Sequence, residues 1–167
     1  MYSVPECVLD LRFNIFHAHG LVTCAVSIGH EIGVDVEYVQ RNINYHMLAP
    51  TVLAPAEMHA LNARIPDEQS RYFYILWILK EAYIKALGVG VTLSLNEFWF
   101  DLEGAGPQVR LTTPSSDESE RWQFVRFDPT PEHALALAVI GMPDQSLRTN
   151  IQWIIPSVMM QKFDDMG

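Results

Sequence analysis

Apolar and polar positions alternate along the first part of the chain in a pattern that predicts β-strands. Three segments show it: residues 8–16 (VLDLRFNIF), 21–28 (LVTCAVSI) and 32–39 (IGVDVEYV). The third alternates strictly after its glycine, so successive side chains are expected on opposite faces of a sheet. The chain is therefore predicted to begin with strands.

The periodicity then changes to that of helices. Residues 54–65 (APAEMHALNARI) place Pro55 at a first helical position and Glu57 in the first turn. A longer helix is predicted from Pro66 to a stop signal at Gly88, with acidic residues at its start. Strand-like patterns return at residues 94–102, 108–113, 122–127, 133–141 and 151–155. This order predicts an α+β fold in which an antiparallel sheet packs against the long helix.

Composition narrows the class of protein. The chain has 167 residues, is 49% hydrophobic and carries a formal net charge of −9, which suits one compact domain and argues against a nucleic-acid-binding surface. The longest apolar run, Tyr72–Leu79, is far shorter than the ~18 residues of a membrane span, so no membrane partner is expected. Cys7 and Cys24 lack CxxC spacing, which predicts reduced thiols in a cytoplasmic protein, with Cys24 in the core.

The strand segment GVDVE, residues 33–37, brings two acids to one face. Asp35 and Glu37 are two positions apart, so their Cα atoms are expected about 7 Å apart on the same side of the strand. Two such carboxylates can share one hard cation such as Mg²⁺. The alternative is a half-exposed strand with two solvated acids, and the DxE pattern alone does not decide between them.

The long helix contains a second candidate, LWILKEAYIKALG at residues 76–88. Glu81 and Lys85 are spaced as an i,i+4 ion pair with the acid first, which stabilises an exposed helix by about 0.2–0.5 kcal/mol. The helix around them, with Trp77 on the same side as Glu81, is too apolar for an ordinary solvated face. Charges on such a helix are expected to be paired or to meet a ligand. A carboxylate here would add to the two on the strand, and Lys80 and Lys85 would supply positive charge for phosphate oxygens.

Taken together, these segments resemble the 4′-phosphopantetheinyl transferases of the Sfp type. GVDVE followed by WxxKEAxxKxxG carries the resemblance, and FNIFHAHG (13–20) is similar to the family's FNxSH segment. LAPAEMHAL (53–61) looks like the start of the family's FxxxE helix. The resemblance covers residues 12–100 well and the later strands loosely. It implies a 4′-phosphopantetheinyl transferase-like α+β fold.

The resemblance also implies an activity and a site. Family members transfer the phosphopantetheine arm of coenzyme A to a serine of an acyl or peptidyl carrier protein and release 3′,5′-ADP. Carried over by position, the magnesium ligands are Asp35, Glu37 and Glu81, and the lysines near the pyrophosphate are Lys80 and Lys85. His17 matches a histidine that helps to hold the nucleotide phosphates. Glu81 is the expected base for the carrier serine, and Lys85 the group that stabilises or protonates the leaving phosphate.

Two features depart from the family pattern. Phe16 stands where the family has serine, beside His17. Only a dozen residues precede the FNxSH-like segment, whereas two-lobed members have a whole first lobe there. The expected organisation is residues 1–28 as the end of lobe one, 29–145 as the transferase lobe and 146–167 as a tail. Three explanations compete for this short first segment: a truncated or misassigned start, a partner chain or second copy of this chain that replaces the missing lobe, or a natural fragment with little activity.

Other functions remain open from the sequence. A degenerate transferase would bind a carrier protein or coenzyme A without turnover, and Phe16 favours that alternative. The small trimeric holo-acyl-carrier-protein synthases have similar motifs, but the FNIFH segment before GVDVE fits the two-lobed class better. For carrier docking, the expected contacts are Tyr45, Met47 and Leu48 after the acidic strand, with ordinary loop and core residues as the alternative.

Overall fold

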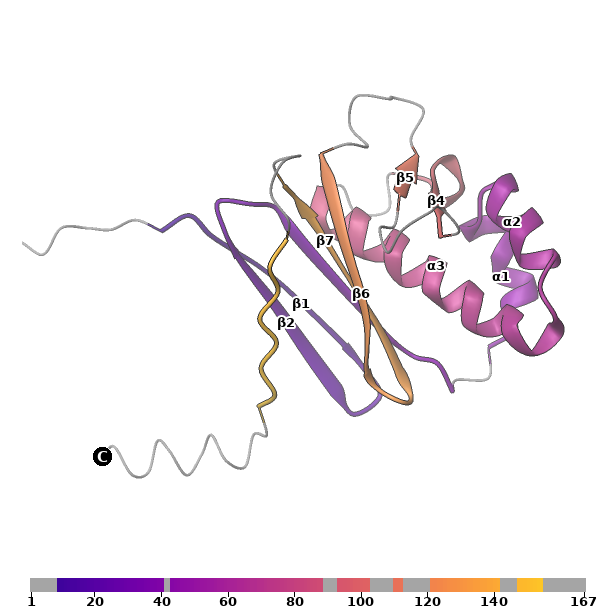
Figure 1. Cartoon of the computed structure of the whole chain (residues 1–167), viewed down its shortest axis with the longest axis horizontal. Coiled ribbons are helices and arrows are strands. Elements are labelled where there is room, and N and C mark those ends of the chain that lie inside the picture. The colour runs from indigo at the N-terminus through magenta and orange to yellow at the C-terminus, as the bar shows by residue number, and fades with distance from the viewer. Residues whose placement is uncertain are drawn as a thin grey trace, which may run out of the picture.

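The chain folds as a three-layered α+β unit (Figure 1). This computed structural model describes residues 9–40, 43–88, 93–102, 110–112, 121–141 and 147–154. The strands are β1 Leu11–Ala18, β2 Leu21–Ile28, β3 Ile32–Tyr38, β4 Trp99–Asp101, β5 Arg110–Thr112, β6 Trp122–Thr130 and β7 His133–Ile140. The helices are α1 Tyr45–Val52, α2 Pro55–Asn62 and α3 Pro66–Leu87, with a 3-10 turn η2 at Leu95–Glu97. The predicted α+β class with an antiparallel sheet and a long helix is confirmed.

The central layer is the antiparallel sheet β3-β7-β6. Alternation along β7 divides its side chains between two layers: Ala134, Ala136 and Ala138 join the core under α3, whereas Leu135 and Leu137 join a second core. The second core lies against the antiparallel hairpin β1-β2. Figure 1 shows α3 on one side of the sheet and the hairpin on the other.

Helix α3 begins and ends where local chemistry predicts. Pro66 is its first residue, Asp67 and Glu68 lie in its first turn, and Gly88 ends it in the left-handed conformation with φ 67°. Glycine adopts that conformation without the steric cost of a Cβ atom. Helix α2 likewise begins at Pro55, but it ends at Asn62, three residues before the predicted boundary.

The structure corrects four local predictions. Helix α1 was not predicted, because Pro50 lies inside it and interrupted the pattern. Residues 94–102 form η2 and the short strand β4, not one strand. The structure assigns no strand to residues 151–154. Cys24 is exposed and not in the core, because it lies on the outer face of the β1-β2 hairpin.

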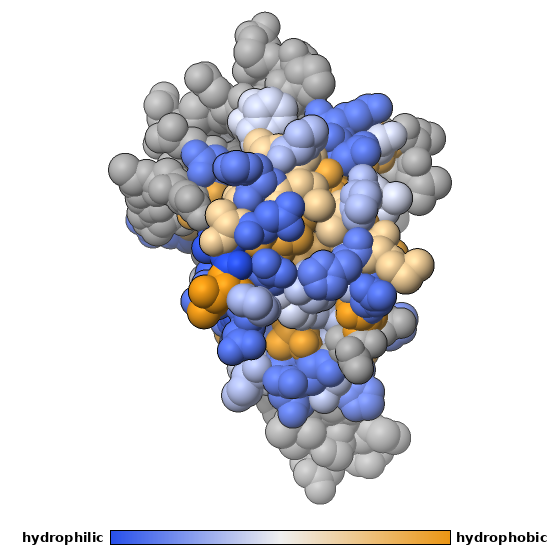
Figure 2. All heavy atoms as spheres, turned by 90° about the vertical axis from the view of Figure 1, so that its right-hand side faces the viewer, coloured by the Kyte–Doolittle hydropathy of each residue, from blue (hydrophilic) through white to orange (hydrophobic). Residues whose placement is uncertain are grey.

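That outer face is apolar. The register pairs Leu11 with Ile28, Phe13 with Val26, and His17 with Val22, so their side chains share one side of the hairpin. Phe13 is 64% exposed and Val22 72% exposed. We refer to Leu11, Phe13, Ile15, Val22, Val26 and Ile28 as the outer hairpin face. By contrast, Figure 2 shows hydrophobic residues on the α1–α2 side of the molecule in separate groups among hydrophilic ones.

Candidate functional site

The candidate site lies where α3 crosses β3, and a glycine sets the distance between them. A Cβ atom added to Gly33 would overlap the carbonyl oxygen of Ala82 and would lie 2.5 Å from the backbone nitrogen of Ala86. Only a residue without a side chain permits this approach. Helix residues 81 and 85 are therefore brought close to Asp35, which lies two positions after Gly33 on the same face of β3.

Asp35 and Lys85 form the centre of the site. Asp35 is fully buried, and its Oδ1 accepts a hydrogen bond from the Nζ of Lys85 at 2.5 Å. The same ammonium lies 3.0 Å from the centre of the Phe16 ring, which comes from β1. The second oxygen of Asp35, Oδ2, is buried and has no hydrogen-bond partner. A buried carboxylate oxygen without a donor is costly, so this oxygen favours either a proton or a cation.

The electrostatics of Asp35 link it to the other two predicted acids. Burial is the main cause that raises the pKa of Asp35, to about 7, and the nearby Lys85 opposes that shift. The negative charges of Glu37 and Glu81 raise this pKa further. Both glutamates are half-buried. The predicted acids thus form an electrostatically coupled group around the Asp35–Lys85 pair.

The donor set suits a divalent cation, but the side chains are not gathered around one point. Carboxylate oxygens are the ligands that Mg²⁺ takes in proteins, and the free Oδ2 of Asp35 offers one. Among the described residues, however, no three His, Cys, Asp or Glu side chains converge closely enough to hold an ion. The predicted convergence of Asp35, Glu37 and Glu81 is therefore not present in this conformation, in which Lys85 balances the charge of Asp35.

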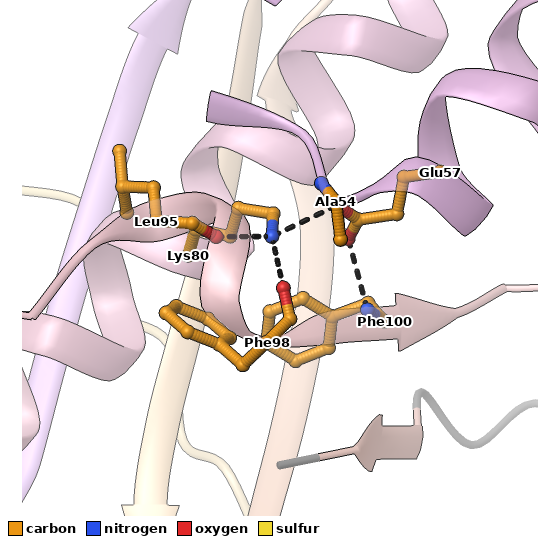
Figure 3. A network of polar contacts seen from close by, with 6 residues as sticks. All are labelled: Ala54, Glu57, Lys80, Leu95, Phe98 and Phe100. Atoms are coloured by element: carbon orange, nitrogen blue, oxygen red, sulfur yellow. Dashed lines mark hydrogen bonds and ion pairs between the residues drawn. The ribbon is translucent and has the colours of Figure 1, made fainter. Parts of the chain in front are cut away.

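Lys80, the other lysine predicted near the pyrophosphate, lies apart from the Asp35–Lys85 pair and belongs to a buried network. Its ammonium is fully buried and pairs with Glu57 of α2 at 2.8 Å. It also donates hydrogen bonds to the carbonyl oxygens of Leu95 and Phe98, at 2.7 and 2.5 Å (Figure 3). Lys80 and Lys85 are five positions apart, which turns the two side chains to different sides of the helix. Lys80 therefore ties η2 and Phe98, the residue before β4, to α3.

Glu57 completes this buried network. Its Oε2 accepts the backbone N–H of Ala54 at 2.8 Å, and its Oε1 accepts that of Phe100 at 2.9 Å (Figure 3). Desolvation raises the pKa of Glu57 and lowers that of Lys80, and their mutual attraction opposes both shifts. The sequence marked Glu57 only as a helix-start residue. Its pairing with a lysine more than twenty positions away was not visible in any local pattern.

The remaining predicted residues lie around these two centres. His17 is exposed on the opposite side of β1 from Phe16, so it does not approach Asp35. Trp77 packs edge-on against Phe73, with ring centres 5.3 Å apart, so it takes part in the packing of α3. On α1, Tyr45 donates a hydrogen bond to Gln69 at 3.1 Å, whereas Met47 is 75% exposed. Of these two residues, only Met47 has an exposed side chain that is available to contact a carrier protein.

Two residues that hold the site together were missed as functional. Phe16 was recorded only as a departure from a family pattern, yet its ring contacts Lys85. Asn14 accepts a hydrogen bond from the backbone N–H of Val34 at 3.0 Å, which attaches β1 to the edge of β3 beside Asp35. The signal was the FNIF segment itself, which placed both residues before the acidic strand.

One hollow of about 330 Å³ lies among the described residues, on the Glu57 side of α3. Ala60, Tyr72, Trp99 and Leu102 are among the residues that line it. It is separate from the Asp35–Lys85 pair and takes no part in that site.

Solved structures define the fold class. The chain is similar to the holo-[acyl-carrier-protein] synthase of Neisseria meningitidis, with TM-score 0.56 and 19% identity over 67% of this chain and 98% of that one. It is also similar to the holo-(acyl-carrier-protein) synthase of Bacillus anthracis, solved in complex with CoA (3′,5′-ADP), with TM-score 0.55 and 20% identity over 66% of this chain and 94% of that one. The fold is therefore that of the acyl-carrier-protein synthases.

Sequence comparison identifies the family. Residues 31–139 match the model of the 4′-phosphopantetheinyl transferase superfamily, and the chain belongs to that superfamily. It is 34% identical to the 4′-phosphopantetheinyl transferase Sfp of Bacillus subtilis, over 86% of this chain and 63% of that protein. It is 33% identical to the transferase HetI of a Nostoc strain, over 78% of this chain and 52% of that protein. The resemblance to the Sfp-type class is confirmed, and the chain spans between half and two thirds of these relatives' length.

Proposed function

We propose that the chain takes part in transfer of the 4′-phosphopantetheine group of coenzyme A to a serine of an acyl or peptidyl carrier protein. The observation that carries the proposal is the buried Asp35–Lys85 pair beside Glu37 and Glu81, in a chain of the 4′-phosphopantetheinyl transferase superfamily. Coenzyme A in the similar Bacillus anthracis structure supports the same substrate. The expected cytoplasmic location stays a prediction. No described helix is long and apolar enough to cross a membrane.

The reaction is a phosphoryl transfer in which positioning and charge provide most of the acceleration. The carrier serine oxygen forms a bond to the phosphorus next to pantetheine, the pyrophosphate P–O bond breaks, and 3′,5′-ADP leaves with the electron pair. Glu81, or a water molecule that it holds, accepts the serine proton. Lys85 donates hydrogen bonds to the phosphate oxygens or a proton to the leaving phosphate.

In this proposal, Asp35, Glu37 and Glu81 would hold a magnesium ion. When bound, the ion supplies Lewis-acid stabilisation of the charge that develops on the pyrophosphate. The chain's own contribution is to keep Asp35 buried with one unpartnered oxygen, and to keep the half-buried glutamates close enough to couple with it. His17, exposed on the outer side of β1, is proposed to contact the nucleotide phosphates. Lys80 is assigned a structural role instead.

The test is transfer of a fluorescent pantetheine group from a labelled coenzyme A to apo carrier proteins. Wild type is expected to label a carrier in the presence of Mg²⁺, and Glu81→Gln to lose at least about 100-fold in rate if Glu81 provides general-base catalysis. Glu68→Gln is the matched control, because Glu68 is an exposed carboxylate on the same helix. Equal rates for wild type and Glu81→Gln would contradict the assigned role. No labelling with any carrier would contradict the proposed activity of the chain alone.

A second candidate is favoured by the outer hairpin face, whose large apolar side chains are exposed. Such a surface is typical of an interface. The second candidate is therefore a chain that is active only with a second copy or a partner chain, or one that binds coenzyme A or a carrier without turnover. Calorimetry with coenzyme A separates these cases, because binding of coenzyme A without carrier labelling favours a chain that binds without turnover. Labelling that rises with the square of chain concentration favours activity as a homo-oligomer.

A further inference from the structure

A segment after β7 has the sequence of a strand but no partner strand. Residues 147–153 (LRTNIQW) alternate apolar or β-branched residues with polar ones, which is the pattern of a strand with one apolar side. In the structure, residues 147–154 form no helix, turn or bend, and Figure 1 draws them, in yellow, as coil. None of their backbone groups is hydrogen-bonded to another described backbone group. The segment therefore lacks the neighbour that would pair its backbone as a strand.

The large apolar side chains of this segment are exposed. Trp153 is 62% exposed and Ile151 is 52% exposed, and they lie two positions apart, so an extended backbone places them on the same side. Gln152 lies between them and would face the opposite side. Aromatic and β-branched residues are favoured in strands, and tryptophan is enriched at protein interfaces. Pairing of this segment with a sheet would therefore present one continuous apolar side for burial.

Strand β2 offers an edge on which a further strand can pair. Among the described strands, β2 is hydrogen-bonded to β1 alone. β1 is the strand attached to β3, because Asn14 accepts the backbone N–H of Val34. The edge of β2 that faces away from β1 is therefore the open edge of the hairpin. Unpaired N–H and C=O groups along such an edge act as a template for an added strand.

Charge favours a second copy of this chain as the neighbour. The chain carries a net charge of −9, so most contacts between two copies would bring acids together. Neither β1 nor β2 contains an aspartate or a glutamate, and the outer hairpin face is apolar. The one charged residue of the segment, Arg148, is positive and is attracted to an acidic copy. The hairpin and the segment are thus regions where two copies can meet without like-charge repulsion.

The surfaces are also large enough for a stable dimer. β1, β2 and residues 147–154 have eight residues each. A specific interface usually involves about 20–30 residues on each side. In a two-fold arrangement each copy gives its segment and receives that of the other, so the same surface serves on both sides.

We propose that residues 147–154 form a strand on the open edge of β2 in a second copy of this chain, with Ile151 and Trp153 extending that copy's outer hairpin face. Two copies exchange the segment reciprocally, and each hairpin becomes a three-stranded sheet. This inference does not depend on the proposed function, since it uses no residue of the Asp35–Lys85 site and its test involves no carrier labelling.

The first test is the mass of the full chain, by light scattering after size exclusion with a reductant present. Wild type is expected at twice 19.0 kDa. Trp153→Asp is expected to raise the Kd of the dimer at least about 30-fold, because a central interface tryptophan carries much of the binding energy. Gln152→Asp adds the same charge on the opposite side and is expected to stay within about three-fold of wild type. Equal Kd values for these two variants would overturn the proposal.

A second variant separates strand pairing from simple apolar attraction. Thr149→Pro combined with Asn150→Pro keeps Ile151 and Trp153 but removes backbone N–H groups from both sides of the segment. This variant is expected to fold, since the segment has no backbone pairing with the described part of its own chain. It is expected to weaken the dimer at least about 10-fold. A dimer as tight as that of wild type would overturn the proposal.

Hydrogen exchange identifies the occupant of the edge. The amides of residues 147–154 are expected to be protected in the wild-type dimer and to lose protection on dilution below its Kd. Protected amides in a monomer would assign the segment to its own hairpin. A dimer with unprotected amides would assign association to the outer hairpin face alone, and an unprotected monomer at every concentration would point to a different partner. Each of these three results would overturn the proposal.

Discussion

Gly33 of β3 and Ala82 of α3 are in backbone contact, since a Cβ atom at position 33 would overlap the Ala82 carbonyl oxygen. This contact joins the two motifs that carry the candidate chemistry. It sets the distance between the acidic strand and the helix from which Lys85 reaches Asp35.

Gly33→Ala is therefore expected to separate α3 from β3. Because the obstructing atoms are backbone, the helix itself must move, and overpacking of this kind costs about 1–3 kcal/mol. Urea unfolding is expected to show that loss of stability. Divalent-cation binding, measured separately, is expected to be weaker. The control is Gly141→Ala, whose Cβ would meet the flexible end of the Gln123 side chain. Similar unfolding free energies for the two variants would contradict the contact.

The Asp35 carboxyl is expected to make stability depend on pH. Its pKa is raised by burial to about 7, from an ordinary value of 3.8. Between these values the folded state binds a proton that the unfolded state does not, so stability is lost as pH rises from about 4 to about 7. The slope is at most about 1.4 kcal/mol per pH unit. The Asp35→Asn variant has no carboxyl group at this position, so its unfolding free energy lacks this contribution to the pH dependence.

The measurement is the unfolding free energy of wild type minus that of Asp35→Asn across this pH range. The difference is expected to fall by roughly 2–4 kcal/mol between pH 4 and pH 7, and to be level on either side. A difference that does not change with pH would show that Asp35 is ionised throughout. Added Mg²⁺ at pH 7.5 is expected to raise the Tm of wild type and not that of Asp35→Asn.

The buried Lys80–Glu57 pair is expected to act on stability and not directly on ligand binding. Lys80→Met leaves the Glu57 carboxylate buried without its counter-ion, which costs about 3–5 kcal/mol in comparable pairs. The double variant Lys80→Met with Glu57→Gln removes both charges and is expected to recover part of that loss. Chemical denaturation measures the unfolding free energies of wild type, Lys80→Met and the double variant. A Lys80→Met variant that is as stable as wild type but binds coenzyme A weakly would contradict the structural role and support contact of Lys80 with the pyrophosphate.

The outer hairpin face is expected to drive self-association. Phe13→Asp combined with Val22→Lys places charge in the middle of this apolar surface, which should shift the chain toward monomer. Light scattering after size exclusion, with a reductant present because Cys24 lies on the same face, measures the mass. Met47→Lys is the control, since Met47 is equally exposed on α1. A monomeric wild type would contradict the prediction.

The sequence predicted the parts of the site that depend on local pattern. Strand periodicity placed Asp35 and Glu37 on one face of β3, and the helix signals at Pro66 and Gly88 gave α3 its bounds. It was wrong about α1, where Pro50 interrupted the helical pattern, and about the strand before Trp99. In that segment the carbonyl oxygens of Leu95 and Phe98 accept hydrogen bonds from Lys80. These are tertiary contacts, so the local sequence pattern does not reveal them.

By itself, then, the sequence determined the α+β class and the order of acids and lysines, because these follow from short-range periodicity and spacing. Its motifs also carried the resemblance to the family. Only the tertiary structure decided what each charge meets. Lys80 and Lys85 lie five positions apart on one helix, yet one is buried against Glu57 and the other lies between Asp35 and Phe16. The partners come from segments far apart in the chain, and packing alone brings them to opposite sides of α3.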